Sequence, residues 1–249
     1  MFRFDHLVIN VDECYQKDNN YINEIIETGF PYEPSWGKGT RGFKVSNLWI
    51  GNEYFEMVNI LKKDGGGWTK SWTDLYNNGN RGLVCLMLDT NNLDNIYNSL
   101  RSKDINITTP EFLKFKWFFN LFTRTMPWRN SYIKFFEGIP LQIGIQEMKD
   151  DKSRKFMEEY MVPNSKENQI LGIKKVIVKG PFTKNDIELI NRIFQEHIIK
   201  AFPITIRLDN NQTLIFEEEE EYKVDVFTRC DNVNLKDKKI EIENITIYN

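Results

Sequence analysis

The sequence predicts an α+β fold in which strand–helix–strand units repeat along the chain, and three observations lead to it. Apolar residues alternate in some segments, which predicts strands, and recur at helical spacing in others, which predicts helices. The predicted elements follow one another in the order strand, helix and several consecutive strands. This order begins near residue 4 and restarts near residues 82 and 172. The composition, 41% hydrophobic and 14% aromatic, supplies a packed core and excludes an intrinsically disordered chain.

The first unit consists of a strand, a helix and two further strands. Leu7, Ile9 and Val11 share one face of the opening segment, which is the period of a β-strand. Gly29 ends the helix, and Gly51-Asn52 marks a turn between the last two strands. The predicted strands cover residues 4–11, 42–50 and 54–61, and the predicted helix covers residues 19–27.

The second unit repeats this order and is enlarged by a loop. Its strands are predicted at residues 82–88, 131–136 and 141–148, and its helix at residues 93–100. The aromatic stretch 112–122 predicts a core-packing or dimer-facing helix rather than a membrane anchor, because it is short and interrupted by lysines. The glycine-rich segment 64–81 predicts an irregular connector between the two units.

A third unit follows at the C-terminus. Thr183 caps a predicted helix over residues 185–200, on which we expect His197 to be exposed rather than catalytic. The predicted strands are 172–179, 204–208, 213–216, 222–228 and 239–248. The sequence therefore predicts tandem βαβββ units that form curved antiparallel sheets, with a third related half-unit at the C-terminus. We expect a paired domain over residues 1–165 and a C-terminal unit over residues 166–249.

Charge and cysteine usage exclude several classes of protein. The 33 basic and 36 acidic residues give a net charge of −3, which argues against nucleic-acid binding. The chain has no apolar run of about 18 residues, the length that a membrane span needs, and its amino terminus carries charges too early for a signal peptide. The three cysteines are far apart in sequence, which indicates reduced thiols. We expect a cytoplasmic protein with neither nucleic-acid nor membrane partners.

Three segments of the first unit resemble a known group of proteins. They are FDHLVI at residues 4–9, the loop GKGTR at residues 37–41 and YFEMV at residues 54–58. Together with the repeated βαβββ order, they resemble the vicinal oxygen chelate superfamily, and within it the glyoxalase-like group. The resemblance implies a glyoxalase/dioxygenase-like fold whose cupped sheet is open at the centre and holds a metal ion or a small ligand.

The resemblance also implies a set of site residues. Members of the superfamily ligate a divalent metal through the first and fourth strands of both units, and His6 and Glu56 match these positions in the first unit. In the second unit the first-strand position falls at Leu83, which cannot ligate a metal, and the last-strand carboxylate falls at Glu147 or, one residue away, at Gln146. The resemblance thus implies a possible divalent metal with an incomplete ligand set, and otherwise no cofactor.

His6 and Glu56 also stand out without the resemblance. His6 shares a face with Phe4 and Val8, and Glu56 lies among apolar neighbours, where an unpaired charge costs several kcal/mol. The two residues can therefore bind a cation or act as a base and its orienting partner. The alternative is that the two side chains only form hydrogen bonds to each other or to the backbone, at the solvent-exposed opening of the cupped sheet. For Glu147 the alternative is a solvated strand end.

Four further residues are candidates for substrate binding at the rim of the cup. Trp36 and Arg41 flank a glycine-rich loop, and Arg41 can clamp a carboxylate or a phosphate. Trp128 and Arg129 suit an anionic or planar ligand. The alternative for Trp36 and Arg41 is that their loop is an ordinary flexible connection into the hairpin. The alternative for Trp128 and Arg129 is packing at the protein surface.

Two functions remain open at this point. The first is a metal-assisted lyase, isomerase or dioxygenase relative that acts on a small oxygen-rich metabolite in the central cup, with His6, Glu56 and Glu147 as catalytic or metal-ligating residues. The second is a non-catalytic protein of the same fold that sequesters a small molecule. Both functions imply a small-molecule partner, and we expect a possible homodimer.

Overall fold

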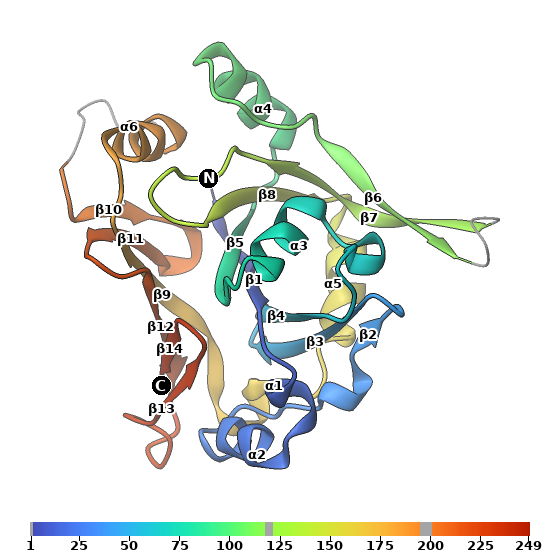
Figure 1. The fold of residues 1–249 in the computed structure, drawn as a ribbon. Helices are drawn as coiled ribbons and strands as arrows, with labels where there is room; N and C mark the ends of the chain where they lie inside the picture. Colours follow the sequence, from blue (N-terminus) through green and yellow to red (C-terminus); the bar gives the residue numbers. More distant parts are fainter. Residues whose placement is uncertain (1, 118–121, 195–200) are drawn as a thin grey trace.

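The computed structural model describes residues 2–117, 122–194 and 201–249 of the 249-residue chain, with side chains undescribed also at 38, 115–117 and 122–124. It confirms the α+β class with curved sheets (Figure 1). In the described residues the strands form an eight-stranded sheet in the order β2-β3-β4-β1-β5-β8-β7-β6 and a six-stranded sheet in the order β10-β11-β9-β12-β14-β13.

The first unit forms as the sequence predicts. A short helix α1 (Cys14–Lys17) precedes α2 (Asn19–Glu27), whose cap Asp18 accepts a hydrogen bond from the Asn20 amide. The strands are β1 (Arg3–Asn10), β2 (Lys38–Gly39), β3 (Phe43–Ile50) and β4 (Glu53–Ile60), with a 3-10 turn at Pro34–Trp36. β1 pairs in parallel with β4, as expected when a helix connects the first strand to a meander.

The second unit has the predicted order but different bounds. Its elements are β5 (Gly82–Asp89), α4 (Leu93–Ser102), β6 (Glu111–Trp117), β7 (Phe122–Tyr132) and β8 (Gln142–Met148). The helix predicted over 112–122 is wrong, because residues 111–117 form a strand that pairs with β7. Apolar residues and lysines alternate there with period two, which favours a strand. The two strands form an arm that projects from the body of the protein (Figure 1).

The two units are joined through their first strands. β1 and β5 are antiparallel neighbours at the centre of the large sheet, and β5 pairs in parallel with β8 as β1 does with β4. Each unit therefore occupies one half of the sheet, and corresponding positions in the two units are found from the register of these strand pairs.

The C-terminal sheet repeats this arrangement in reduced form. The predicted half-unit contains β9 (Ile170–Gly180), α6 (Lys184–Ile193), β10 (Ile204–Arg207) and β11 (Thr213–Glu218). A second reduced unit without a helix follows, with β12 (Lys223–Cys230), β13 (Lys239–Ile242) and β14 (Ile245–Tyr248). The sequence did not predict this unit, because it read residues 239–248 as one strand. A turn at Glu243, with φ of 55°, divides that segment into two strands.

In the part of the chain that the structure describes, two helices lie outside the repeats. α3 (Lys70–Asn77) forms within the segment predicted as an irregular connector, after a 3-10 turn at Gly65–Gly67. α5 (Asp151–Glu159) follows β8 and begins at the Asp150 cap. Further 3-10 turns are Ser165–Asn168 and Asp209–Asn211. The end of the predicted helix 185–200, including His197, lies outside the described residues.

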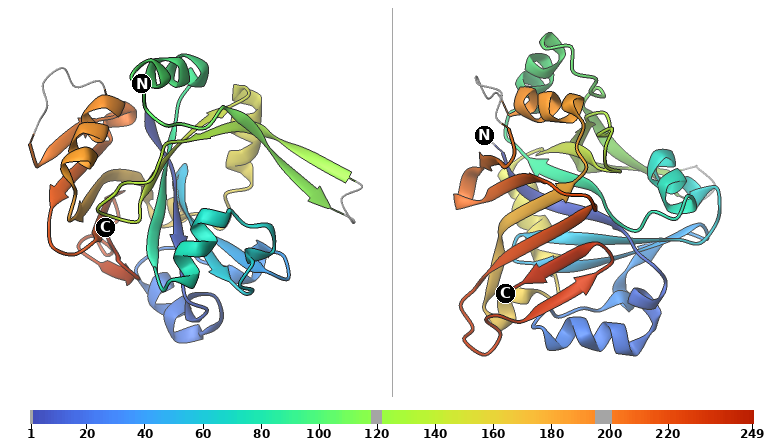
Figure 2. Two further views of the ribbon diagram at one scale, coloured as in Figure 1. Left: turned by 45° about the horizontal axis from the view of Figure 1, so that its top comes forward. Right: turned by 60° about the vertical axis from the view of Figure 1, so that its left-hand side comes forward.

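One hydrophobic cluster joins the two sheets. Leu7 and Ile9 of the large sheet and Val176 of the small sheet belong to it and are fully buried, and α2, α4 and α6 add apolar side chains at its edges. Figure 2 shows the six-stranded sheet on one side of β1 and β5, opposite the arm. We call the other face of the large sheet, on which Val8 and Met87 lie, the concave face; a separate cluster fills part of it.

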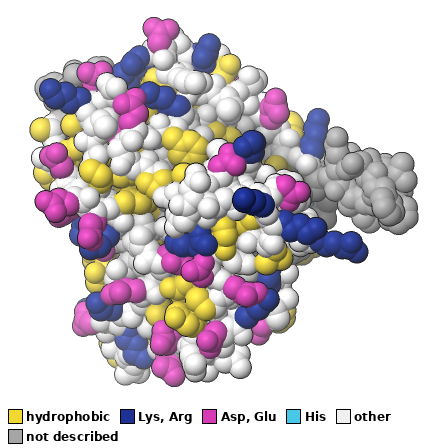
Figure 3. Space-filling model, viewed as in Figure 1, with side chains coloured by type: hydrophobic (Ala, Val, Ile, Leu, Met, Phe, Trp, Pro, Cys, Tyr) yellow, Lys and Arg dark blue, Asp and Glu magenta, His cyan; other side chains and the backbone are white. Residues whose placement is uncertain are grey.

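On the surface, charges of both signs alternate with apolar side chains over the face seen in Figure 3. Among the described residues, no helix combines the length and the apolar character needed to cross a membrane. The division at residue 165 and the homodimer stay predictions of the sequence.

Candidate functional site

Two rows of residues cross the concave face, and in each row every residue is paired with the next one on the neighbouring strand. The first row runs from β3 to β7 and contains Trp49, Tyr54, His6, Met87, Gly144 and Tyr132. The second row runs from β3 to β8 and contains Asn47, Glu56, Val8, Cys85 and Gln142. His6 and Glu56 are diagonal neighbours in adjacent rows and strands, with 4.0 Å between His6 Nε2 and Glu56 Oε2.

A bulge in β1 brings a second carboxylate to His6. The register of β1 against β5 shifts between Phe4 and His6, which leaves Asp5 without a direct partner on β5. Asp5 Oδ2 lies 2.5 Å from His6 Nδ1. The expectation that Phe4 shares the face of His6 is wrong, since Phe4 is packed in the cluster between the two sheets. The site therefore has the order Asp5–His6–Glu56, with the imidazole between two carboxylates.

The three side chains of this array differ in their exposure to solvent, and burial shifts the pKa of Glu56. The exposed fraction of the side chain is 8% for His6, 13% for Asp5 and 23% for Glu56, so solvent reaches the glutamate end. Burial raises the pKa of Glu56, and the nearby His6 opposes that rise. The Tyr54 ring stacks on the imidazole at 4.5 Å between ring centroids. Asp5 can hold the Nδ1 proton, which leaves Nε2 as the basic atom toward Glu56.

The concave face also carries unsatisfied polar atoms. Within the described residues, the buried side-chain atoms without a hydrogen-bond partner are Asn10 Oδ1, Asn47 Oδ1, Asn130 Oδ1 and Trp68 Nε1. All of them lie on this face: the three asparagines by strand alternation and register, and Trp68 by packing on Phe43 and Trp72. Buried polar groups in folded proteins have partners, so water or a ligand is expected here.

The second unit does not supply matching ligands. The register of β1 and β5 is symmetric about Leu7 and Leu86, so Cys85 rather than Leu83 corresponds to His6. Gly144 pairs with Met87 as Glu56 pairs with Val8, so the position that corresponds to Glu56 is Gly144 rather than Glu147 or Gln146. Leu83 is fully buried in the cluster between the sheets. The Gln142 Oε1 atom accepts a hydrogen bond from Trp72 Nε1 at 3.0 Å. Trp72, from α3, thus occupies the half of the concave face that belongs to the second unit.

The donor set therefore does not fit the metal site implied by the resemblance. In the described part of the chain, no group of three or more His, Cys, Asp or Glu side chains is close enough to hold a metal ion. His6 and Glu56 are the first-unit pair, and the second-unit positions carry Cys85, a fully buried thiol bonded to Met87, and Gly144, which has no side chain.

Glu147 and Arg129 do not join this site. Gln146 lies on the concave face, so the next residue, Glu147, points to the opposite face of β8. Glu147 accepts hydrogen bonds from the Leu93 amide at the start of α4 and from Arg129. Arg129 also binds Asp94 through two bonds of 3.0 and 2.9 Å, and it lowers the pKa of that aspartate. This network fastens α4 to the sheet.

The remaining rim candidates lie apart from His6. Arg41 is exposed and precedes Phe43, and six residues along the strand direction, about 20 Å, separate it from the Asn47 row. Trp36 is 65% exposed. Trp128 shares the concave face with Tyr132 by alternation along β7 and remains a candidate for ligand contact.

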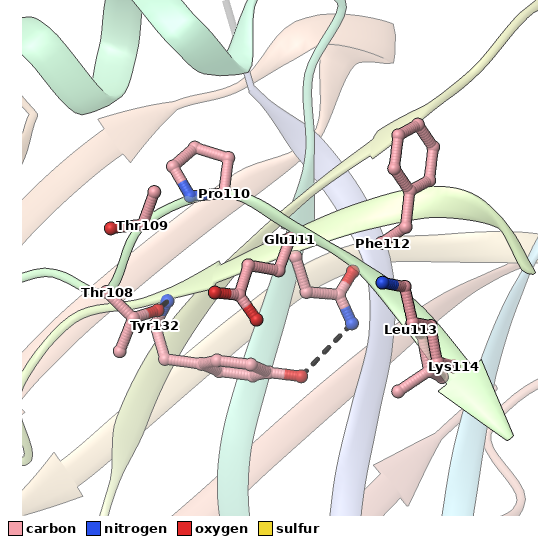
Figure 4. A pocket seen from close by; sticks show the side chains of 9 residues that line it. Thr108, Thr109, Pro110, Glu111, Phe112, Leu113, Lys114 and Tyr132 are labelled. Atoms are coloured by element: carbon pink, nitrogen blue, oxygen red, sulfur yellow. Dashed lines mark hydrogen bonds between the residues drawn. The ribbon is translucent and has the colours of Figure 1, made fainter. Parts of the chain in front are cut away.

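A hollow of about 920 Å³ opens beside the first row, between residues 108–114 and the side chains of Asn130 and Tyr132 (Figure 4). The sequence did not single out these residues, although Tyr132 fell within the strand predicted at residues 131–136. It also missed Asp5 as a partner of His6 and Cys85 as the counterpart of His6 in the second unit. Adjacency to His6 was a usable signal for Asp5, whereas Cys85 could be found only from the strand register.

Comparisons with known proteins show the fold. No family model and no curated protein matches the chain. A solved structure titled a hypothetical protein from Staphylococcus aureus matches with a TM-score of 0.67 at 15% identity, covering 99% of this chain and 98% of the other.

Smaller solved structures match part of the chain. A Streptomyces coelicolor methylmalonyl-CoA epimerase in complex with 2-nitronate-propionyl-CoA gives a TM-score of 0.41 at 14% identity, covering 59% of this chain and 98% of the other. The epimerase from Mycobacterium tuberculosis gives 0.41 at 14% identity, covering 60% and 90%. The full-length match shows that the two chains share one fold over nearly their whole lengths.

Proposed function

We propose that the protein belongs to the glyoxalase-like group of the vicinal oxygen chelate superfamily and is a lyase or isomerase that moves a proton on a small oxygen-rich metabolite. The observation that carries this proposal is the Asp5–His6–Glu56 array, which solvent reaches at Glu56. The tandem units and the match of His6 and Glu56 to the first-unit positions of the superfamily support it. Fold alone fixes no reaction, so the proposal depends on these side chains.

The chemistry requires no step through a metal. His6 Nε2 takes a proton from the carbon next to a carbonyl group, and the C–H electron pair forms the C=C bond of an enediol. Glu56, as a carboxylic acid, gives its proton to the carbonyl oxygen. Burial raises the pKa of Glu56, which favours this protonated form. Asp5 orients the imidazole and stabilises the imidazolium that forms.

The second candidate is a non-catalytic protein that sequesters a small molecule. Trp72 and its bond to Gln142 favour it, since they fill the half of the face that would complete a metal centre. Trp49 and Tyr54 supply an aromatic wall on the other half. A binder of this kind needs the unsatisfied polar atoms of the concave face but not a base at His6.

Deuterium uptake separates the two functions. The protein, in D₂O with a chelator, is mixed with small α-hydroxy ketones such as hydroxyacetone, and loss of the α-proton signal is followed by NMR. We expect uptake with the wild type and with Ser71→Ala, an exposed control, and none with His6→Gln. Binding without uptake supports the sequestering protein. Neither binding nor uptake for any α-hydroxy ketone rejects the proposed reaction class.

A further inference from the structure

Asn47, on β3, is the direct cross-strand partner of Glu56, so the two side chains lie next to each other on the concave face. Asn47 is half-buried, and its Oδ1 atom is buried without a hydrogen-bond partner. Among the described residues nothing accepts a hydrogen bond from its Nδ2 atom either, but solvent reaches that atom. Asn47 therefore presents an unused N–H donor beside Glu56.

The other neighbours of Glu56 on this face have different surroundings. Val8 belongs to the apolar cluster of the concave face, and the Tyr54 ring stacks on the His6 imidazole. Glu56 makes no hydrogen bond to any residue that the structure describes, and 4.0 Å separates its Oε2 atom from His6 Nε2. The Glu56 carboxyl group and the Asn47 amide are thus two free hydrogen-bonding groups, side by side and next to the proposed base.

The spacing of these two groups suits a single oxygen atom between them. Side chains of directly paired residues in an antiparallel sheet lie about 4.5–5.5 Å apart. Two hydrogen bonds of about 2.8 Å that meet at one oxygen atom require donors at most about 5.6 Å apart. A carbonyl oxygen has two lone pairs, so it can accept one bond from protonated Glu56 and one from Asn47 Nδ2.

We propose that Asn47 and Glu56 form a two-donor site for one carbonyl oxygen of the ligand. This inference rests on the proposed function and adds Asn47 as a catalytic residue. In the proposed reaction the C–H electron pair forms the C=C bond, and the C=O π pair moves onto this oxygen, which takes the Glu56 proton. Asn47 Nδ2 donates a hydrogen bond to the oxygen while negative charge develops on it, and transfers no proton itself. Because this charge is largest in the transition state, Asn47 lowers the barrier more than it strengthens binding.

The first test measures deuterium uptake from hydroxyacetone over a range of its concentrations. Asn47→Leu and Asn47→Asp both remove the N–H donor, the first without and the second with a new charge. Each is expected to lower kcat by about 10²-fold or more, while KM changes by less than about threefold. The same two substitutions at Asn98, an exposed residue of α4, are expected to leave both constants unchanged. A lower melting temperature without this division between kcat and KM would show a merely structural role and overturn the inference.

The second test observes the carbonyl group directly and needs no turnover. Hydrogen bonds to a carbonyl oxygen withdraw electrons from the carbonyl carbon, which raises its ¹³C chemical shift. We expect the labelled carbonyl carbon of bound hydroxyacetone to have a higher shift in the wild type than in Asn47→Leu, and the wild-type shift in Asn98→Leu. Asn47→Asp, which is close to asparagine in size, serves the same comparison where Asn47→Leu folds poorly.

The two measurements separate this inference from the proposed function. Uptake that both Asn47 variants retain at the wild-type rate, with an unchanged carbonyl signal, overturns the inference and leaves His6 as the base. Binding without uptake by the wild type, with a carbonyl signal that changes in Asn47→Leu, rejects the proposed reaction and keeps the two-donor site. A wild type that binds no α-hydroxy ketone overturns both.

Discussion

Glu53, at the start of β4, accepts a hydrogen bond of 2.8 Å from the Gln212 side chain, and this bond joins the two sheets. Gln212 also accepts from the Phe4 amide at 2.8 Å, next to the Asp5 bulge, and Glu53 accepts from the Ile173 amide at 2.9 Å. The C-terminal sheet is thereby tied to the strand that carries Asp5 and His6. Both Glu53 and Gln212 are buried.

This junction predicts a pH-dependent stability. Burial raises the pKa of Glu53 from 4.5 to about 7, ahead of the opposing effects of the Ile173 amide and Arg229. The folded protein therefore binds this proton more tightly than the unfolded chain does. The contribution is fully present below pH 4.5 and is lost as the pH rises through 7. We expect the free energy of unfolding to fall by up to about 3 kcal/mol over that range.

Urea unfolding at pH 4.5, 6 and 8 measures this effect. Glu53→Gln is expected to flatten the pH dependence, while Glu13→Gln, at an exposed site, leaves it as in the wild type. Equal stabilities of the wild type at pH 4.5 and pH 8 would contradict the shifted pKa.

The Asp5–His6 contact predicts a graded loss of proton transfer. Asp5→Asn removes the charge that stabilises the imidazolium, so we expect deuterium uptake to fall at least about tenfold. His6→Gln removes the base, and the expected loss is about 10²-fold or more. Both rates come from the NMR assay in D₂O, with thermal unfolding to verify the fold. Uptake by Asp5→Asn at the wild-type rate would show that Asp5 does not assist His6.

The incomplete donor set predicts a protein without a resident metal. We expect protein purified without chelators to contain well under one equivalent of any divalent metal by elemental analysis, and His6→Ala to leave that content unchanged. EDTA is expected not to alter deuterium uptake. One equivalent of metal that disappears in His6→Ala would instead demonstrate a metal site that includes His6.

We expect the removal of the Trp72 side chain from the second half of the concave face to lower the stability of the protein strongly. Trp72 is 4% exposed, packs edge-on against Tyr132 and bonds Gln142, so Trp72→Ala is expected to lower the free energy of unfolding by about 3–5 kcal/mol. The neighbouring exposed Ser71→Ala is expected to change it by less than about 0.5 kcal/mol. Urea denaturation measures both. A small effect of Trp72→Ala would mean that α3 is not anchored through this side chain.

The sequence predicted the elements whose period is unambiguous. The first unit and β5, α4 and β8 follow from alternation, helical spacing and turn residues. The arm was misread because its large aromatic residues suggested a packed helix, although the lysines alternate with them as in a strand. α3 was missed because Gly65–Gly67 made its segment look irregular as a whole.

By itself, the sequence determined that the units repeat, because alternation and helical spacing are read along single segments. Its resemblance to a known superfamily suggested His6 and Glu56 as one site. Only the tertiary structure decided which residues complete the site. The bulge at Asp5, the match of Gly144 to Glu56 and the opposite direction of Glu147 depend on register between strands, and a shift of one residue turns every side chain to the other face. Trp72 reaches the site from a helix outside the repeats, so no period within them encodes its position.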